Sequence, residues 1–258
     1  MPEGPEILLF KYYLDEKILN KFIINIISIS KKKVIIPEKA KINGVGAKGK
    51  LLWLETKNYY IHILLKISGW ISNENLKNPK YILIFDDGTK IYIDDPRKLC
   101  TINIITKSNH NKVLEMLGLY IFSNQFILNN FSKLIYQYKI NICAFLMDQY
   151  IIAGIGNYIK NECLYLAKIN PKRKTNTLNS KEIKKLYEAI KFVSYSNLVE
   201  QLEQYKLVIS KDLGKLMPLN LEVPYNLKVY KQEYDINGFQ VIAQIINGRN
   251  TYFVPEIQ

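Results

Sequence analysis

The sequence predicts an α+β protein with a strand-rich N-terminal half, a helical middle and a β-hairpin at the C-terminus. Short runs of β-branched and aromatic residues, separated by turn residues, fill much of the chain up to about residue 94. From about residue 112 the apolar residues recur at helical spacing instead. Near the C-terminus the pairs Asn237-Gly238 and Asn247-Gly248 favour tight hairpin turns. We therefore expect three domains, at 1–120, 121–225 and 226–258.

The first expected element is an amphipathic helix over about residues 5–17. Its apolar residues Ile7, Phe10, Leu14 and Ile18 recur at three- and four-residue steps, which places them on one helix face. Pro5 suits the first turn, because its φ angle is already helical. Acidic residues at this end complement the helix dipole.

The start of this helix also carries a reactive pair. Removal of Met1 would leave the secondary amine of Pro2 beside the carboxylate of Glu3. An α-amino group titrates at about pH 8, so part of it is unprotonated at neutral pH and can attack an aldehyde carbon to give an iminium. Taken alone, the hexapeptide fits helix capping and covalent catalysis equally well.

After this helix the pattern predicts strands at 22–29, 51–55, 59–66, 81–85 and 90–94. Asp87-Gly88 lies between the last two runs and is a strong hairpin signal. Several short strands of this kind favour a sandwich or a barrel.

The helical part follows, with helices expected at 112–117, 132–138, 141–148, 157–166 and 180–204. Residues 206–224 show no period and are expected to form a loop. Strands return at 227–232, 239–246 and 251–254, and the two Asn-Gly pairs join them. In the last hairpin we expect cross-strand packing of Val241, Ile245, Tyr252 and Phe253.

Composition excludes several classes of protein. No stretch reaches the roughly 18 uninterrupted apolar residues of a membrane span, and no basic region leads into an apolar stretch at the N-terminus, so we expect a soluble intracellular protein. The three cysteines, Cys100, Cys143 and Cys163, are widely spaced and form no CxxC pair. This spacing argues against a disulfide framework or a thiolate zinc site, and we expect no metal.

The charge balance points to a polyanionic partner. The formal net charge is +13, and lysines far outnumber the three arginines, Arg97, Arg173 and Arg249. Basic side chains release counterions from a phosphate backbone when they bind it. An arginine fork makes planar contacts that an ammonium cannot make, so each arginine is a candidate for specific recognition. Solubility or an AT-rich genome would also explain part of the lysine content.

A second informative motif lies in the helical part, at Gly154-Ile155-Gly156-Asn157. Two glycines allow a ligand to approach the backbone closely, and Asn157 stands where the next helix opens. Such an opening would hold a phosphate. A glycine loop between two helices is also ordinary turn sequence.

Four motifs in order resemble the formamidopyrimidine-DNA glycosylase and endonuclease VIII (Fpg/Nei) family, and they span most of the chain: Met1-Pro2-Glu3-Gly4-Pro5-Glu6, Gly49-Lys50-Leu51-Leu52, Asp95-Pro96-Arg97-Lys98, and the run from Ile142 through Asp148-Gln149 to Asn157. The Cys-free hairpin at Asn247-Gly248-Arg249 is similar to the zincless finger of the Nei-like branch, of eukaryotic or viral type. The fold that the resemblance implies is an N-terminal β-sandwich with a leading helix, a helix-two-turns-helix (H2TH) domain and a zincless β-hairpin finger.

The resemblance also implies an activity, that of a bifunctional DNA glycosylase and AP lyase of base excision repair without a cofactor. Pro2 would be the nucleophile that attacks C1′ of the damaged nucleotide. Glu3 would shuttle protons, Glu6 would support the same site, and Lys50 would contact phosphate and assist departure of the base. In isolation, Lys50 is better explained as a solvated lysine at a strand edge.

The same resemblance implies how DNA is held. The target nucleotide must leave the duplex, so Arg97 would read the opposite base while Ile67 and Leu99 fill the gap. Gly156, Asn157 and Arg249 would grip phosphates, and His62 would touch one as well. Without the resemblance, an apolar strand residue is more often core, His62 is as readily structural, and Arg173 is part of a general basic patch.

Two departures from the family pattern put the preferred lesion and opposite base in doubt. The segment from His62 to Gly69 is two residues longer than the family's, and Lys98-Leu99-Cys100 replaces Arg-Phe-Gly. The expected partner is DNA with oxidised bases or abasic sites, bound by a monomer in the nucleus, in the cytoplasm or in a virus. The alternative is a catalytically silent module that binds damaged DNA. A metal-dependent nuclease would need a carboxylate cluster, for which Asp86-Asp87 and Asp94-Asp95 are the nearest candidates.

Overall fold

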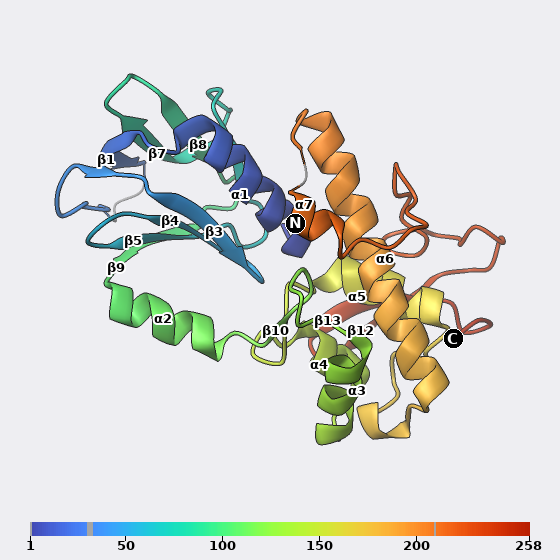
Figure 1. The fold of residues 1–258 in the computed structure, drawn as a ribbon. Helices are drawn as coiled ribbons and strands as arrows, with labels where there is room; N and C mark the ends of the chain where they lie inside the picture. The colour runs from blue at the N-terminus through green and yellow to red at the C-terminus, as the bar shows by residue number, and fades with distance from the viewer. Residues whose placement is uncertain (1, 30–32, 209) are drawn as a thin grey trace. The chain divides into compact units, whose positions relative to one another are not determined.

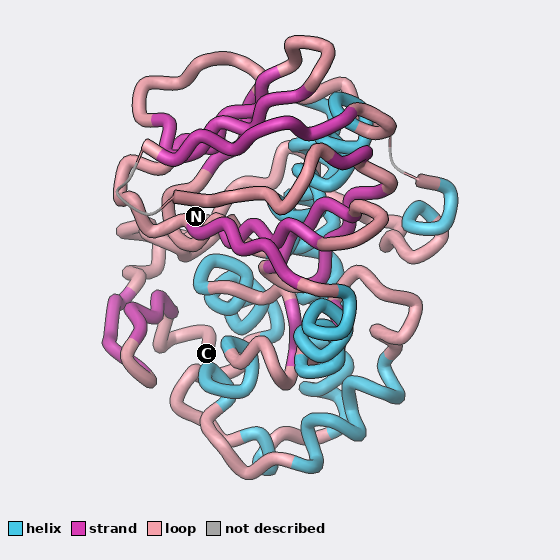
Figure 2. Tube along the Cα trace, turned by 90° about the vertical axis from the view of Figure 1, so that its left-hand side faces the viewer, coloured by secondary structure: helices cyan, strands magenta, loops and turns pink. Residues whose placement is uncertain are grey.

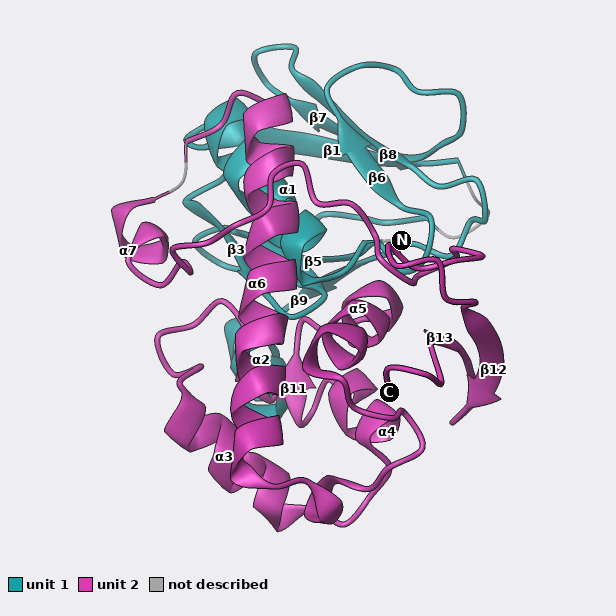
Figure 3. Ribbon diagram, turned by 90° about the vertical axis from the view of Figure 1, so that its right-hand side faces the viewer, with its two compact units in different colours: residues 1–116 teal, residues 117–258 magenta. Residues whose placement is uncertain are grey.

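A computed structural model of the chain describes residues 2–29, 33–208 and 210–258 (Figure 1). The chain forms two compact units, residues 1–116 and residues 117–258, coloured separately in Figure 3. The first unit is built mainly of strands and the second mainly of helices. The predicted α+β class and the order of strands, helices and terminal hairpin are confirmed. No helix in the described ranges is both long enough and apolar enough to cross a bilayer.

The first unit pairs its strands into two antiparallel sheets. One sheet has the order β2-β1-β7-β8-β6 and the other β3-β4-β5-β9. Their bounds are β1 Phe22–Ser28, β2 Ala40–Lys41, β3 Gly44–Lys48, β4 Leu51–Glu55, β5 Tyr60–Leu64, β6 Trp70–Ser72, β7 Pro79–Phe85, β8 Lys90–Asp94 and β9 Thr101–Ile105. All five strands predicted in this half are present.

Two helices flank these sheets within the first unit. Helix α1 (Gly4–Ile18) packs against β3 and β4, with Ile7, Phe10, Leu14 and Ile18 all buried as their spacing predicts. Helix α2 (Lys107–Met116) follows β9. It begins before the predicted position at 112, and it belongs to the strand-rich unit rather than opening the helical one.

The second unit contains the helices expected from the apolar spacing. They are α3 (Leu128–Gln137), α4 (Ile142–Met147), α5 (Asn157–Ala167) and α6 (Ser180–Gln204), with a 3-10 turn at Thr175–Thr177. The short helix α7 (Lys211–Gly214) was not expected, because it lies in the segment 206–224 that was predicted to be a loop. Strands β10 (Leu119–Tyr120) and β11 (Ile152–Ala153) pair in parallel. Helix α6 starts at a capping box between Asn179 and Glu182, and its predicted bounds, 180–204, are confirmed.

The chain ends in the hairpin of β12 (Ile242–Ile246) and β13 (Arg249–Phe253), drawn as paired magenta strands in Figure 2. Asn247 and Gly248 form the turn with φ angles of 48° and 71°, as an Asn-Gly hairpin requires. Phe253 is buried and Val241 packs against the small core around Val254. The prediction that Ile245 packs is wrong, because its side chain is 72% exposed.

The strand predicted at 227–232 is absent. The backbone N–H groups of Lys228, Val229 and Tyr230 all donate to the buried carboxylate of Glu162, at 2.8 to 3.0 Å. The Tyr225 hydroxyl donates to the same carboxylate at 2.8 Å. A side chain on α5 therefore satisfies the donors that a neighbouring strand would otherwise take.

Candidate functional site

Pro2 and Glu3 directly precede α1, and the helix start fixes their position. The Glu3 N–H donates to the Glu6 carboxylate at 2.7 Å, and the two residues form a capping box. Glu3 is fully buried, and Glu6 is nearly so. The capping interpretation is confirmed, and it gives Glu6 a definite task, which is to hold the Pro2-Glu3 dipeptide in one conformation. Met1 lies outside the described residues.

Lys50 occupies the two-residue turn that joins β3 to β4. Gly49, with φ of 63°, allows the chain to reverse there, and Lys50 follows it with a partly exposed side chain. Figure 1 shows the start of α1, in dark blue, toward the same end of the unit as the arrowhead of β3. The predicted cation thus sits on a rigid hairpin of the sheet against which α1 packs.

Two turns of the first unit carry the residues predicted to fill the gap in DNA. Ile67 lies in the turn after β5, and Leu99 lies in the loop between β8 and β9. Their side chains are 37% and 43% exposed, so neither is a core residue. Arg97, also exposed, makes no side-chain hydrogen bond or ion pair with any residue that the structure describes.

A buried polar network joins these two turns. Asp95 accepts hydrogen bonds from the Ser68 hydroxyl and, at 2.5 Å, from the Cys100 N–H, while the Arg97 N–H lies 3.3 Å from the Ser68 oxygen. The buried Lys80 ammonium donates to the carbonyls of Lys98 and, at 2.6 Å, of Cys100. Ile67, Arg97 and Leu99 are therefore presented together by one rigid support, and sequence patterns did not identify its residues Ser68 and Lys80.

His62 is placed differently from the other predicted contacts. Its ring is only 5% exposed, and its Nε2 lies 2.8 Å from Nδ1 of His110 on α2. Burial, with the nearby His110, lowers the pKa of His62 to about 4. The His110 ring stacks on Tyr60, with centroids 3.9 Å apart. This setting fits a neutral packing residue, and a phosphate contact for His62 stays a prediction that its burial does not favour.

In the second unit, the glycine loop before α5 is held by Gln149. Its side-chain amide donates to the Ile155 carbonyl at 2.8 Å and accepts from the Gly154 N–H at 3.0 Å. Gly154 has φ of 113°, and a Cβ there would lie 2.9 Å from the Ile121 side chain, so only glycine fits. The conformation of this loop is thus fixed by specific side-chain contacts, although the motif alone also fitted ordinary turn sequence.

Asn157 is the first residue of α5, and Gly156 is its N-cap, as the motif predicts. The free N–H groups of this first turn and the positive end of the helix dipole suit a phosphate. The Asn157 side chain donates to the Asn250 carbonyl on β13 at 3.0 Å, and an amide nitrogen has a second hydrogen to offer. Asn157 is therefore tied directly to the hairpin.

Arg249 opens β13 immediately after the Asn247-Gly248 turn. It is exposed, and within the described ranges its guanidinium has no hydrogen-bond or ion-pair partner. Arg173 differs, because it pairs with Glu182 and donates to the Thr177 carbonyl. The Arg173 guanidinium is therefore engaged within the fold, and its place in a general basic patch stays a prediction. Of the three arginines, Arg97 and Arg249 have guanidinium groups that no described residue engages, so these groups can bind a ligand.

The cysteines are buried and unpaired within the part of the chain that the structure describes. Burial raises the pKa of all three thiols, Cys100, Cys143 and Cys163, which keeps them protonated. Residues 2–29, 33–208 and 210–258 contain no group of three His, Cys, Asp or Glu side chains that could hold a metal ion.

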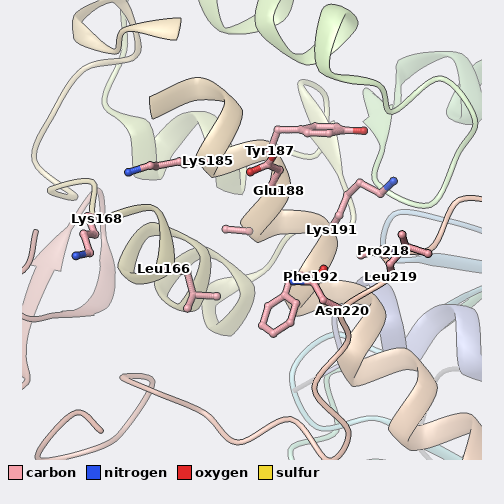
Figure 4. A pocket seen from close by; sticks show the side chains of 11 residues that line it. Leu166, Lys168, Lys185, Tyr187, Glu188, Lys191, Phe192, Pro218, Leu219 and Asn220 are labelled. Carbon is pink, nitrogen blue, oxygen red and sulfur yellow. The ribbon is translucent and has the colours of Figure 1, made fainter. Parts of the chain in front are cut away.

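A separate cavity of about 620 Å³ lies along α6 in the second unit (Figure 4). Leu166, Phe192 and Leu219 supply apolar walls, and Lys185 and Glu188 lie on the α6 side. None of the predicted site residues lines this cavity. This cavity is therefore not part of the candidate site.

Comparison with known proteins identifies two domains in this chain. Residues 1–102 match the formamidopyrimidine-DNA glycosylase N-terminal domain, and residues 117–203 match the formamidopyrimidine-DNA glycosylase H2TH domain. A formamidopyrimidine-DNA glycosylase of Wolbachia from Brugia malayi is 30% identical over 205 residues, which cover 74% of this chain and 76% of that protein. The protein of the same name from Listeria monocytogenes is 27% identical, with both chains covered completely.

Solved structures agree with these matches at the level of the fold. The MutM (Fpg) protein from Thermus thermophilus superimposes with a TM-score of 0.82 at 21% identity, covering 100% of this chain and 98% of that one. A variant of Lactococcus lactis Fpg, in complex with DNA containing Fapy-dG, gives a TM-score of 0.81 at 22% identity, with 100% and 99% covered. The paired domains and the full-length relatives together show that this chain belongs to the formamidopyrimidine-DNA glycosylase family.

Proposed function

We propose that this protein is a DNA glycosylase of base excision repair that removes oxidised bases and then cleaves the strand as an AP lyase. Its family membership supports the glycosylase activity, and relatives carry the name formamidopyrimidine-DNA glycosylase. The observation that carries the covalent mechanism is the Pro2-Glu3 dipeptide, held at the start of α1 by the capping box with Glu6. Lysine excess gives the chain the charge that a DNA partner requires.

In the proposed reaction the unprotonated Pro2 amine, freed by removal of Met1, attacks C1′ of the damaged nucleotide. The bond from C1′ to the base breaks, and the base leaves with a proton. The sugar ring opens to give an iminium between Pro2 and C1′, which acidifies the C2′ proton. Loss of that proton eliminates the 3′ phosphate, and hydrolysis of the iminium frees the enzyme.

Side chains near the amine would carry the protons. A carboxylate adjacent to Pro2 can take up the proton that the amine loses on attack and, as the carboxylic acid, deliver it to the ring oxygen while the sugar opens. This assigns the proton shuttle to Glu3. Glu6 is a positioning residue, because its carboxylate is engaged by the Glu3 backbone. Lys50, on its turn, would contact the phosphate beside the lesion and stabilise the charge of the departing base.

The two DNA-holding groups would divide the remaining work. In the first unit, Ile67 and Leu99 would fill the gap left by the extruded nucleotide, and Arg97 would bind the orphaned base. In the second unit, Asn157 and Arg249 would grip backbone phosphates, which positions the DNA independently of its sequence. The Fpg of Lactococcus lactis is known in complexes with Fapy-dG-containing DNA and with AP-site-containing DNA, which supports such ligands here.

Placement in the Nei-like branch, of eukaryotic or viral type, rests on the Cys-free hairpin alone. The relatives described above are bacterial proteins of the formamidopyrimidine type. We propose that the Cys-free hairpin of β12 and β13 serves as a zincless finger in this chain.

Borohydride trapping on DNA that carries an abasic site tests the proposal. The mature protein is expected to form a covalent adduct at the Pro2 nitrogen, and a form that retains Met1 is expected to form none. An adduct of equal yield in the blocked form would overturn the Pro2 mechanism. The alternative, a silent module that binds damaged DNA, predicts tight binding with no adduct in either form.

A further inference from the structure

Lys160, on α5, is a buried cation that the proposed reaction does not use. Its side chain is fully buried, in a chain whose other lysines are mostly on the surface. Burying an ammonium costs free energy unless acceptors surround it. The burial of Lys160, one turn from the start of α5 at Asn157, therefore needs a physical explanation.

The explanation is a hydrogen-bond relay from Lys160 to Arg249. The Lys160 Nζ donates to the Thr251 hydroxyl oxygen at 2.8 Å, and the Thr251 hydroxyl lies 3.3 Å from the Arg249 carbonyl oxygen. An ammonium only donates, so the Thr251 oxygen must accept from it, and the single hydroxyl hydrogen is left for Arg249. Thr251 is fully buried, like Lys160.

Flanking bonds fix the same stretch of β13 to α5. The Asn157 side chain donates to the Asn250 carbonyl at 3.0 Å, and the Asn161 side chain accepts from the Tyr252 N–H at 3.2 Å. Residues at positions i, i+3 and i+4 share one face of a helix, so this face of α5 binds three successive residues of the strand. Lys160 supplies the central bond and the only charged one of the three.

Within the hairpin, Arg249 pairs with Ile246 of β12 beside the turn. Strand β12, its partner, is mostly exposed along its length. At the turn, the Asn247 side chain donates to Asn141 at 2.6 Å, and that bond is exposed to solvent. The direction in which Arg249 leaves the strand therefore depends mainly on how firmly β13 is docked on α5.

We propose that Lys160 is a positioning residue for phosphate recognition, acting through Thr251 to set the backbone of Arg249. The inference rests on the proposed function, in which Arg249 and Asn157 bind DNA phosphates. Lys160 itself touches no DNA, because it is buried. Its loss should therefore weaken DNA binding only through Arg249.

A double-mutant cycle between Lys160→Met and Arg249→Ala tests this prediction. The measurement is the Kd for a duplex with a tetrahydrofuran abasic-site analogue, over a range of salt concentrations, with circular dichroism to verify folding. Lys160→Met is expected to weaken binding about tenfold, or about 1.4 kcal/mol, and to lower the salt slope by about one, as loss of a phosphate contact does. In the Arg249→Ala background it should have less than about a twofold effect.

A matched control removes one lysine charge elsewhere in the same unit. Lys184→Met, on the exposed surface of α6, changes the net charge as Lys160→Met does and should leave the affinity and the salt slope unchanged. Thr251→Val and Thr251→Ser keep the test decisive if Lys160→Met does not fold. Thr251→Val removes the hydroxyl that links Lys160 to Arg249, so it should weaken DNA binding as much as Lys160→Met does. Thr251→Ser keeps the hydroxyl and should bind DNA with wild-type affinity.

Several outcomes would overturn the inference. They are wild-type affinity in folded Lys160→Met, additive effects of the Lys160 and Arg249 changes, or equal defects in the valine and serine variants. A normal affinity for Arg249→Ala would also overturn it, because no phosphate contact would then depend on the relay. Borohydride trapping would still report the Pro2 chemistry in that case, so the two failures are distinguishable.

Discussion

Asp95 accepts a hydrogen bond from the hydroxyl of Ser68, and this bond joins two turns that β6, β7 and β8 separate in the sequence. The turn that contains Ser68 carries Ile67, and the loop that starts at Asp95 carries Arg97 and Leu99. A single buried carboxylate thus organises the three side chains that we expect to occupy the gap in the duplex.

The first prediction concerns Asp95→Asn. Burial raises the pKa of Asp95, but hydrogen bonds from Cys100 and Ser68, together with the nearby Lys80, outweigh burial and hold the pKa below its usual value. At pH 7 the variant should lose about 2 kcal/mol of unfolding free energy, the size of a buried hydrogen bond to a charged group.

The pH dependence gives this prediction a second test. A carboxylate with a lowered pKa stabilises the fold above the unfolded pKa of about 4, and the stabilisation is lost as the pH falls through the folded pKa. The difference between wild type and Asp95→Asn in urea unfolding should therefore shrink from pH 7 to pH 3. A constant difference would contradict the assigned role of the charge.

The second prediction concerns His62 and His110, the only two histidines in the chain. Burial, followed by the effect of His110, lowers the pKa of His62 to about 4, and burial also lowers that of His110, although Glu55 opposes the shift. Unfolding restores a pKa of about 6.5, so the unfolded chain takes up protons that the fold excludes.

Stability should therefore fall as the pH drops from about 6.5 to 4, by up to about 1.4 kcal/mol per pH unit for each proton. Urea unfolding of wild type and of His62→Gln at pH 7.5, 6 and 5 measures this loss. The variant should be less stable at pH 7.5 and show a shallower slope below pH 6.5. Equal slopes would show that another group controls acid unfolding.

The third prediction separates Glu3 from Glu6. Glu3→Gln should leave DNA binding largely intact and slow base excision by about 10²- to 10⁴-fold, because it removes a proton carrier. Glu6→Gln should cost much less, since glutamine also accepts the Glu3 N–H in a capping box. Single-turnover excision and Kd measurements report both effects, and a parallel loss of binding and chemistry in Glu3→Gln would contradict proton transfer.

The fourth prediction concerns Asn157. Asn157→Ala should weaken binding of lesion-bearing DNA in every sequence context alike, because the contact is to phosphate. The matched control is Asn130→Ala on α3, whose side chain also donates to a backbone carbonyl, that of Gln125, at 2.9 Å. Fluorescence anisotropy with several duplexes compares the two. Unchanged affinity and turnover in Asn157→Ala would contradict the phosphate contact and would mean that the glycine loop is only a structural turn.

Much of this fold was predictable because its signals are local. Helix α6 is predicted by its apolar periodicity and by the capping box at Asn179. The hairpin at Asn247-Gly248 is predicted because its turn needs two positive φ angles, which few other residue pairs adopt. Strand β3 escaped prediction because it contains Gly44 and Gly46, residues of low strand propensity. Gly46 is required there by tertiary structure, since a Cβ would lie 2.1 Å from the Trp53 ring.

The supports of the candidate site were not predictable, because they join residues far apart in the chain. Nothing local links Ser68 to Asp95, Lys160 to Thr251, or Glu162 to the segment at 228–230. In each case a buried charged side chain makes hydrogen bonds to a turn, strand or loop that is distant in the sequence. Sequence motifs indicated the side chains that point outward, such as Arg97 and Arg249, whereas the side chains that hold them carry no local signature.

The last prediction concerns Arg249 and uses Arg173 as its matched control. Arg249→Ala should weaken lesion binding by about 2 to 3 kcal/mol, because a charge-assisted contact to phosphate is lost. Arg249→Lys should restore only part of the affinity, since an ammonium keeps the charge and loses the forked geometry. Arg173 already pairs with Glu182, so Arg173→Ala should lower thermal stability and leave the DNA affinity near wild type. The measurements are the Kd and the melting temperature of the three variants. Equal losses of affinity in Arg249→Ala and Arg173→Ala would contradict the prediction. They would mean that binding depends on net charge and not on the position of one arginine on the hairpin.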